Sequence, residues 1–318
     1  MNLLLSTGFV LCWSSGFIGA KLGAGSASAV TILMWRFLPL AVVLAVLALV
    51  RRAAWRCLGR RAAARQVAIG VLSQSGYLLT VYHAIQLGVS SGTTALIDGV
   101  QPLVTGALAG PLLRQQVSRV QWLGLGLGTC GVVIVTLADA SADTGAGAGA
   151  GVAWWAYLTP FLGMFSLVGA TFLERRSLDR VDPLMALTVH CATSAVIFTA
   201  LAISVGAARP PAELSFWVAI AWLVTLSTFG GYGLYWLILK RSGTTWVNTL
   251  MFLMAPVTAV WGSLMFGEPF GAQTAVGLSI GLAAVVVVHR GDTSSSTVRA
   301  RSADGARRRT RLKVSRSE

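Results

Sequence analysis

The sequence predicts an all-α membrane protein with ten transmembrane helices, arranged as two inverted five-helix repeats. Three observations support this fold class: the composition is very apolar, long apolar runs follow one another along most of the chain, and basic residues gather in alternate loops. Of the 318 residues, 55% are hydrophobic and only 11% are charged, whereas soluble domains contain about 25% charged residues. No stretch remains for a separate soluble domain.

The apolar runs define the helices in order. A transmembrane helix needs roughly 20 mostly apolar residues, and such runs lie at 2–22, 28–50, 66–87, 91–113, 119–138, 152–173, 183–206, 214–239, 243–267 and 270–290. The first run is either a signal peptide or a membrane helix. We read it as a helix because no basic segment precedes it and the apolar stretch is long for a signal peptide.

These runs divide the chain into four parts. Residues 1–138 form the first repeat, and a Gly/Ala-rich linker at 139–151 joins it to the second repeat at 152–290. Residues 291–318 are rich in Ser and Arg and lack an apolar pattern. Such a composition predicts a disordered basic tail.

The positions of the basic residues test this segmentation. If the N-terminus is cytoplasmic, 22 of the 25 Lys and Arg residues fall in cytoplasmic loops or in the tail. Lys21 and Arg209 fall outside, and Arg36 lies within a helix. The positive-inside rule therefore predicts ten helices with both termini in the cytoplasm. The basic tail is then expected to bind anionic lipids of the cytoplasmic leaflet.

The two halves resemble each other. A shift of 154 positions places Pro102 on Pro256 and Arg36 on His190. Any two apolar stretches align a little by chance, but the shared prolines and glycines favour duplication. Because each half has five helices, the second half enters the membrane from the opposite side. Inverted repeats are a known transporter design, with the substrate site near the middle of the membrane.

Several short motifs resemble the EamA family of the drug/metabolite transporter (DMT) superfamily. They are Trp13-Ser14-Ser15-Gly16-Phe17, Trp35-Arg36-Phe37, the helix that contains Pro102, Ala255-Pro256-Val257 and Phe266-Gly267-Glu268. The resemblance covers residues 2–290. It implies a multi-pass protein of the bacterial inner membrane that exports or exchanges small metabolites such as amino acids.

Ionisable residues within the membrane are costly and point to function. Arg36 and Asp98 each lie about eight residues from the outer end of their helix, which corresponds to a depth of about 12 Å. They either face a shared polar cavity, bridged or separated by substrate, or form a structural ion pair. His190 occupies the position related to Arg36 and is a further candidate for substrate binding.

Other candidate substrate-binding residues are aromatic or small and polar. Trp13 and Ser14 lie near mid-depth, Tyr77 and Tyr232 lie furthest from the helix ends among the aromatic residues, and Asn248 is a polar residue in an apolar run. Aromatic rings line pockets, where a few polar groups fix the orientation of a ligand. The alternatives are tight helix packing for Ser15 and Gly16 and anchoring at the membrane interface for aromatic residues near helix ends.

Pro102 and Pro256 are expected inside helices, where proline removes a backbone hydrogen bond and kinks the chain. Matched positions in both repeats favour a gating role over a tolerated bend. Gly124, Gly128, Gly277 and Gly281 follow small-xxx-small spacing, which brings helices together. This spacing serves either the scaffold or a homodimer contact.

The sequence therefore predicts a secondary transporter that works by alternating access, and not an enzyme. No catalytic residues, metal site or cofactor are expected, and no phosphate-binding Gly-Lys loop indicates a nucleotide-driven pump. The basic residues are not interleaved with aromatics as in a nucleic-acid binder. The alternatives are a membrane-embedded transferase, which needs clustered acids or a His/Asp pair, and a passive channel.

Overall fold

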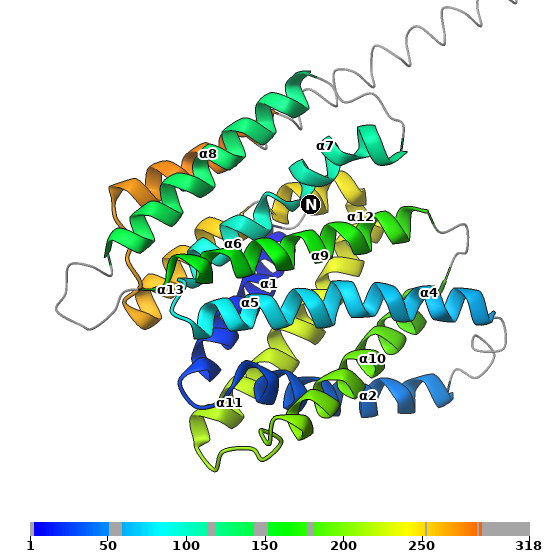
Figure 1. Ribbon diagram of the computed structural model, residues 1–318. Coiled ribbons are helices and arrows are strands. Elements are labelled where there is room, and N and C mark those ends of the chain that lie inside the picture. The colour runs from blue at the N-terminus through cyan, green and yellow to red at the C-terminus, as the bar shows by residue number, and fades with distance from the viewer. Residues whose placement is uncertain are drawn as a thin grey trace, which may run out of the picture.

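The computed structural model describes residues 3–50, 59–113, 119–142, 152–176, 181–251, 253–284 and 286–287, and every regular element within these ranges is a helix (Figure 1). Six of the described helices are long and apolar enough to cross a membrane by length and composition. They are Leu3–Ala24, Ala29–Leu49, Trp122–Ala142, Trp154–Arg175, Pro183–Ser204 and Leu214–Ser242, with shorter apolar helices at Met254–Phe266 and Ala272–Ala284. The predicted tail at 291–318 lies outside the described residues.

The first half contains a long helix that is built from three consecutive parts, α4, η1 and α5. In chain order its elements are α1 (Leu3–Ala24), α2 (Ala29–Val50), α4 (Arg60–Gly70), η1 (Val71–Gly76), α5 (Tyr77–Gln86), α6 (Ser91–Gly99), α7 (Gln101–Leu113) and α8 (Arg119–Ala142). The middle part, η1, is π-helical.

The second half repeats this arrangement. A short 3-10 turn, η2, opens it, and the long helix again carries a π-helical middle part, η3. Its elements are η2 (Trp154–Tyr157), α9 (Leu158–Arg175), α10 (Pro183–Ser204), α11 (Leu214–Trp222), η3 (Leu223–Gly230), α12 (Gly231–Met251), α13 (Met254–Phe266) and the helix Ala272–Ala284.

Local sequence signals set several helix ends. Asp182 caps the N-terminus of α10 by accepting hydrogen bonds from the backbone N–H groups of Leu184 and Met185, and Pro183 occupies the first helical position. Proline suits that position because the first N–H groups of a helix have no partner within it. Gly267 ends α13 in the left-handed conformation, with φ of 65°.

The two halves interlock. α2 packs along α10, α6 packs against α13, α1 packs against η3 and α12, and α9 packs against η1 and α5. In Figure 1, α8 lies beside the helix Ala272–Ala284. A Cβ atom on Gly131 or Gly277 would overlap the backbone of the opposite helix. The close packing predicted at Gly277 and Gly281 therefore occurs between two helices of the same chain, with Gly131 as the facing residue. Gly128 does not take part in this contact and faces Leu103.

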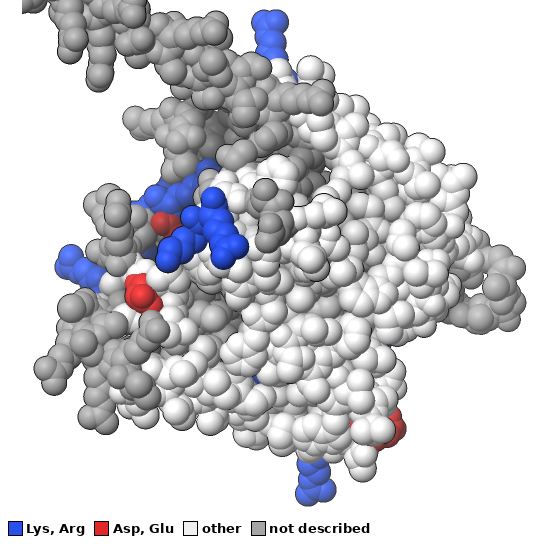
Figure 2. Space-filling view, turned by 180° about the vertical axis from the view of Figure 1, so that it is seen from behind, with Lys and Arg blue, Asp and Glu red and all other residues white. Residues whose placement is uncertain are grey.

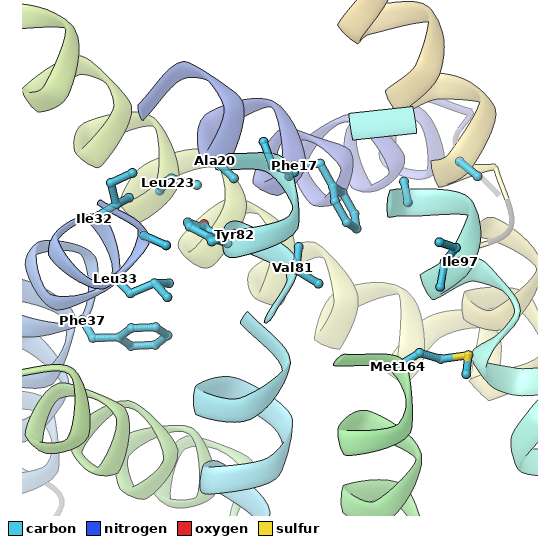
Figure 3. Close-up of a cluster of buried hydrophobic side chains, with 14 of the residues drawn as sticks. Phe17, Ala20, Ile32, Leu33, Phe37, Val81, Tyr82, Ile97, Met164 and Leu223 are labelled. Atoms are coloured by element: carbon cyan, nitrogen blue, oxygen red, sulfur yellow. The ribbon is translucent and has the colours of Figure 1, made fainter. Parts of the chain in front are cut away.

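The core joins helices from both halves. Figure 3 shows Ile32, Leu33 and Phe37 of α2 on the same side of the cluster as Tyr82. The Phe37 ring stacks on Phe198 of α10, with centroids 5.7 Å apart. These side chains are at most 2% exposed.

The surface is apolar over most of the bundle. Leu264 is 80% exposed and Val196 is 70% exposed. Figure 2 shows one face on which uncharged residues predominate and charged side chains gather mainly toward one edge. An exposed apolar surface of this extent fits a lipid environment and not water.

Several helix boundaries differ from the predictions. The helix predicted at 66–87 begins at Arg60, and the helix predicted at 119–138 continues to Ala142, into the predicted linker. The predicted helix 91–113 is interrupted at Val100, between α6 and α7. The predicted helix 214–239 continues as α12 to Met251, so Lys240 and Arg241 are helical and the next helix begins at Met254. Without periodic polarity, an apolar sequence gives little information on where one helix ends.

The expectation that Pro102 and Pro256 lie inside uninterrupted helices is therefore wrong. Each lies in the first turn of its helix: Pro102 follows the interruption at Val100, and Pro256 is the third residue of α13. The first turn tolerates proline because its N–H groups lack intrahelical acceptors. The two prolines nonetheless occupy matching places in the two halves.

Candidate functional site

A cavity with both polar and apolar walls lies in the middle of the bundle, between helices of both halves. Its volume is about 70 Å³ of space for water-sized molecules, whereas a single water needs roughly 10–15 Å³ of such space. The cavity therefore has room for several waters or a small solute. Its walls are formed by Trp13, Gly16, Phe17, Arg36, Ser73, Gln74, Tyr77, Leu78, Val81, Tyr82, Ser227 and Tyr232.

Both π-helical segments face this cavity. η1 contributes Ser73 and Gln74, and η3 contributes Ser227. The shift of 154 positions places Ser73 on Ser227, so the two halves present the same residue type from the same kind of segment. π-Helical turns inside α-helices are rare and are often found at functional sites. The cavity is thus built by equivalent parts of the two repeats.

Arg36 of α2 is the charged group of the cavity wall and is only 5% exposed. Its Nη1 donates to the Tyr82 hydroxyl, and its Nη2 donates to Ser227 Oγ at 3.3 Å and Thr228 Oγ1 at 3.1 Å. The guanidinium carbon also lies 5.5 Å from the ring centroid of Phe37 and 5.9 Å from that of Tyr82. Uncharged groups of both halves therefore hold the guanidinium in place.

The π-helical turn orients the hydroxyls toward Arg36. Thr228 Oγ1 donates its own proton to the carbonyl of Leu223, five residues earlier, at 3.1 Å. The hydroxyl oxygen then presents its lone pairs to the guanidinium. A five-residue spacing is characteristic of a π-helix, so the irregular backbone contributes directly to the setting of Arg36.

Asp98 does not line the cavity but contacts a residue that does, Tyr77. The Tyr77 hydroxyl donates to Asp98 Oδ2 at 2.8 Å. The other oxygen, Oδ1, is buried and has no hydrogen-bond partner among the described residues. Arg36 and Asp98 thus bind different partners, and no ion pair joins them in the described part of the chain.

Aromatic rings form the opposite wall. Trp13 lies 5.5 Å from Tyr232 and 5.9 Å from Tyr235, measured between ring centroids. Gln74 Nε2 donates to the Tyr232 hydroxyl at 3.4 Å, which ties this wall to η1. Rigid rings with a few polar groups are typical of sites for small organic molecules.

The structure brings together four of the predicted substrate-binding residues: Trp13, Arg36, Tyr77 and Tyr232. Ser14 points away from the cavity and donates to the carbonyl of Met254 at 3.4 Å. His190 does not line the cavity; its Nε2 is 2.8 Å from Oε1 of Gln66. Asn248 lies in α12, and its side chain is outside the described residues.

Four polar residues around Arg36 and the cavity were missed by reasoning from the sequence, namely Ser73, Gln74, Ser227 and Thr228. Tyr82 belongs to the set of membrane aromatics, but Tyr77 and Tyr232 were favoured over it because they lie further from the helix ends. The internal repeat contained a usable signal, because the shift of 154 positions pairs Ser73 with Ser227 and Gln74 with Thr228. Matched polar residues within two apolar runs indicate a shared polar surface.

A second polar cluster closes the end of the bundle formed by residues 21–28, 87–91 and 267–271, which we call the Glu268 end. Glu268 is only 8% exposed. Both its carboxylate oxygens accept from the Ser91 backbone N–H at 3.0 Å, and Lys21 Nζ lies 3.2 Å from Oε1. Asp139 accepts from the neighbouring Ser90 N–H at 3.1 Å. Two carboxylates thus cap the N-terminus of α6, where the helix dipole favours negative charge.

No group of three or more His, Cys, Asp and Glu side chains that could hold a metal ion occurs among the described residues. The described free cysteines, Cys12, Cys130 and Cys191, belong to helices α1, α8 and α10.

A bundle of apolar helices in two related halves, with a cavity between them that holds a buried arginine, defines a multi-pass membrane protein of the transporter class. The chain belongs to the EamA-like transporter family, whose model matches it twice, over residues 1–137 and 154–290. This match confirms the resemblance seen in the sequence, including the two repeats and the place within the DMT superfamily.

The comparison with curated proteins found no match. Among solved structures, 12 chains match. One of them, titled only "Crystal structure of protein", is 16% identical and has a TM-score of 0.57, covering 90% of this chain and 95% of its own. At this identity the similarity shows the fold alone.

Proposed function

We propose that the chain is a secondary transporter that exports or exchanges small metabolites such as amino acids, by alternating access around the cavity at Arg36. The observation that carries this proposal is the cavity itself. It holds a buried arginine and several polar side chains, lies midway through an apolar bundle, and is lined from both repeats by matching π-helical segments. Transporters with inverted repeats place their substrate site at such an interface.

The proposed topology has ten membrane crossings, an inverted second repeat and both termini in the cytoplasm of a bacterial inner membrane. The distribution of Lys and Arg supports it. Lys21 and Glu268 then lie at the outer face, and the Arg-rich segment that begins α4 lies at the cytoplasmic face. Cys57, in the loop predicted at the cytoplasmic face, should react with impermeant thiol reagents only from that side, and Cys57→Ala should remove the signal.

Alternating access requires that each end of the cavity closes in turn. The cluster at Glu268 connects α6 of the first half to the end of α13 in the second half. Breaking these hydrogen bonds would allow the two halves to separate at this end. The interruption at Val100 and the start of α13 before Pro256 give each half a place where the chain can bend.

The test is a screen of labelled metabolites with the purified chain in liposomes, with and without a pH gradient. A carrier shows uptake that saturates with concentration for at least one solute, and liposomes without protein provide the control. Uptake that rises linearly with concentration would indicate a channel instead. Flux of none of the metabolites above the control would contradict transport.

A further inference from the structure

We propose that Arg36 forms the binding subsite for the carboxylate group of the transported solute, so that the substrates are small organic carboxylates. This inference rests on the proposed transport function and adds the chemical class of the substrate. Its basis is the unbalanced charge of a buried guanidinium at the cavity wall.

The partners of Arg36 leave its charge without a counter-ion. All three hydrogen-bond acceptors, on Tyr82, Ser227 and Thr228, are neutral hydroxyl groups. No ion pair involves Arg36 within the described residues, so none of their carboxylates lies within 4 Å of its nitrogens. Burying an unpaired charge is strongly unfavourable, so an anion that entered the cavity would recover much of that free energy.

Asp98 does not supply the missing charge. Its Oδ2 is occupied by the Tyr77 hydroxyl at 2.8 Å, and its side chain lies behind the cavity wall. The two rings near the guanidinium, Phe37 and Tyr82, attract a cation more weakly than a carboxylate does. They stabilise the side chain while the site is empty and leave it able to bind an anion.

The donors of Arg36 are only partly used. A guanidinium carries five N–H groups, and three hydrogen bonds are formed. The Nε atom is buried and has no partner among the described residues, and the bond to Ser227, at 3.3 Å, is the longest of the three. Nε and Nη2 lie along one edge of the group, so a rotation that turned this edge toward the cavity would let a carboxylate bind both nitrogens and replace Ser227. Bidentate binding of this kind is the geometry arginine favours.

The remaining walls of the cavity determine the size and polarity of the part of the solute that lies beyond its carboxylate. Trp13, Tyr77 and Tyr232 present rings, and Gln74 and Ser73 add polar groups. The small volume excludes large molecules, while rings accommodate a short apolar or amphipathic body. A monocarboxylate or amino acid matches both the charge and the walls.

The test compares each carboxylate with its own primary amide. The purified full-length chain is equilibrated in Tris chloride buffer with acetate, lactate, leucine or phenylalanine, with the matching amides, and with inorganic phosphate. Dissociation constants come from equilibrium dialysis, and the rise of the thermal unfolding midpoint provides a second readout. We expect at least one carboxylate to bind roughly tenfold or more tightly than its amide, since a hydrogen-bonded charge is lost in the amide.

Variants assign this preference to Arg36. Arg36→Gln should bring the carboxylate-to-amide ratio to about one, and Arg36→Lys should retain part of it. Arg209→Gln, in the exposed loop before α11, should leave the ratio unchanged. The wild-type comparison stands by itself if Arg36→Gln does not fold. Equal binding of acids and amides, binding of phosphate alone, binding of none of the four carboxylates, or an unchanged ratio in Arg36→Gln would each overturn the proposal.

Counterflow measured on the same preparations separates this inference from the proposed function. Carboxylate binding at Arg36 without counterflow supports the subsite and contradicts transport. Counterflow of the amides alone supports transport and contradicts the carboxylate subsite.

Discussion

Glu268, which follows the last helical turn of α13, accepts hydrogen bonds from both the backbone N–H and the hydroxyl of Ser91, the first residue of α6. The hydroxyl bond is 2.6 Å long. The contact joins residues that are 177 positions apart and lie in different repeats. It therefore ties the two halves together at the Glu268 end of the bundle.

Glu268→Gln should destabilise the protein more than Lys21→Gln does. The glutamate accepts several charge-assisted hydrogen bonds, each contributing about 1.5–3 kcal/mol, whereas a partly exposed ion pair contributes about 0–1 kcal/mol. Thermal unfolding midpoints of the two variants measure the difference. If both variants lower the midpoint equally, the ion pair and not the cap of α6 dominates the contact.

Gly76 and Gly230 should be intolerant of alanine in the same way. A Cβ on Gly76 would lie 2.7 Å from Ser166 Oγ, and a Cβ on Gly230 would lie 2.9 Å from Cys12 Sγ. The shift of 154 positions relates both glycines and both partners. Gly76→Ala and Gly230→Ala should each reduce transport by disturbing a π-helical segment.

Removing the opposing side-chain atom should restore function. We expect Gly76→Ala/Ser166→Ala and Gly230→Ala/Cys12→Ala to transport at rates closer to wild type than the single glycine variants. Gly233→Ala is the matched control because the space beside Gly233 is open. Initial uptake rates check this; double variants no better than the single ones would rule out overlap as the cause.

Asp98→Asn should keep exchange and lose any dependence on the pH gradient. Asparagine still offers Tyr77 an acceptor oxygen but cannot take up a proton, and Asp98 Oδ1 is buried without a partner among the described residues. Ionisable groups in such a setting are typical of proton relays. Uptake by liposomes with and without an imposed gradient provides the measurement. An unchanged gradient dependence removes Asp98 as the coupling group.

Pro102→Ala should slow transport without weakening substrate binding. Proline lacks the N–H that would otherwise bond to the carbonyl four residues earlier, here that of Asp98. An alanine restores this donor and favours a helix that continues through Val100. The expected result is a lower turnover at unchanged affinity, seen in the concentration dependence of uptake. Full turnover would show that the interruption is only a tolerated bend.

Position along the helix identified part of the cavity wall, but not which faces of the helices form it. Arg36, Tyr77 and Tyr232 could be found because they lie far from the helix ends, and distance from an end follows from the rise of 1.5 Å per residue. The sequence does not show which face of a helix points toward the cavity when the helix is apolar on all sides, as a membrane helix is. Ser14 and His190, also chosen by depth or symmetry, therefore turned out to face other helices.

Irregular backbone explains most of the remaining errors. Gln74 and Thr228 reach the region of Arg36 from π-helical turns, which change the angle between successive side chains. The boundary predicted at residues 240–242 was wrong because α12 continues through them to Met251, where no glycine or proline marks its end. Glu268 was recognised as the end of a helix, but its partner Ser91 belongs to the other repeat and could not be inferred from local sequence.

The most direct test of alternating access is trans-stimulation in liposomes. In alternating access, the cavity at Arg36 opens to one side at a time and must turn back before the next entry. We expect the carrier to turn back faster with substrate bound than when empty, so unlabelled substrate inside the liposome should accelerate entry of labelled substrate. The wild-type chain should show this acceleration, and Arg36→Gln should lose it for a carboxylate substrate. Entry at the same rate with and without internal substrate in the wild-type chain would contradict alternating access.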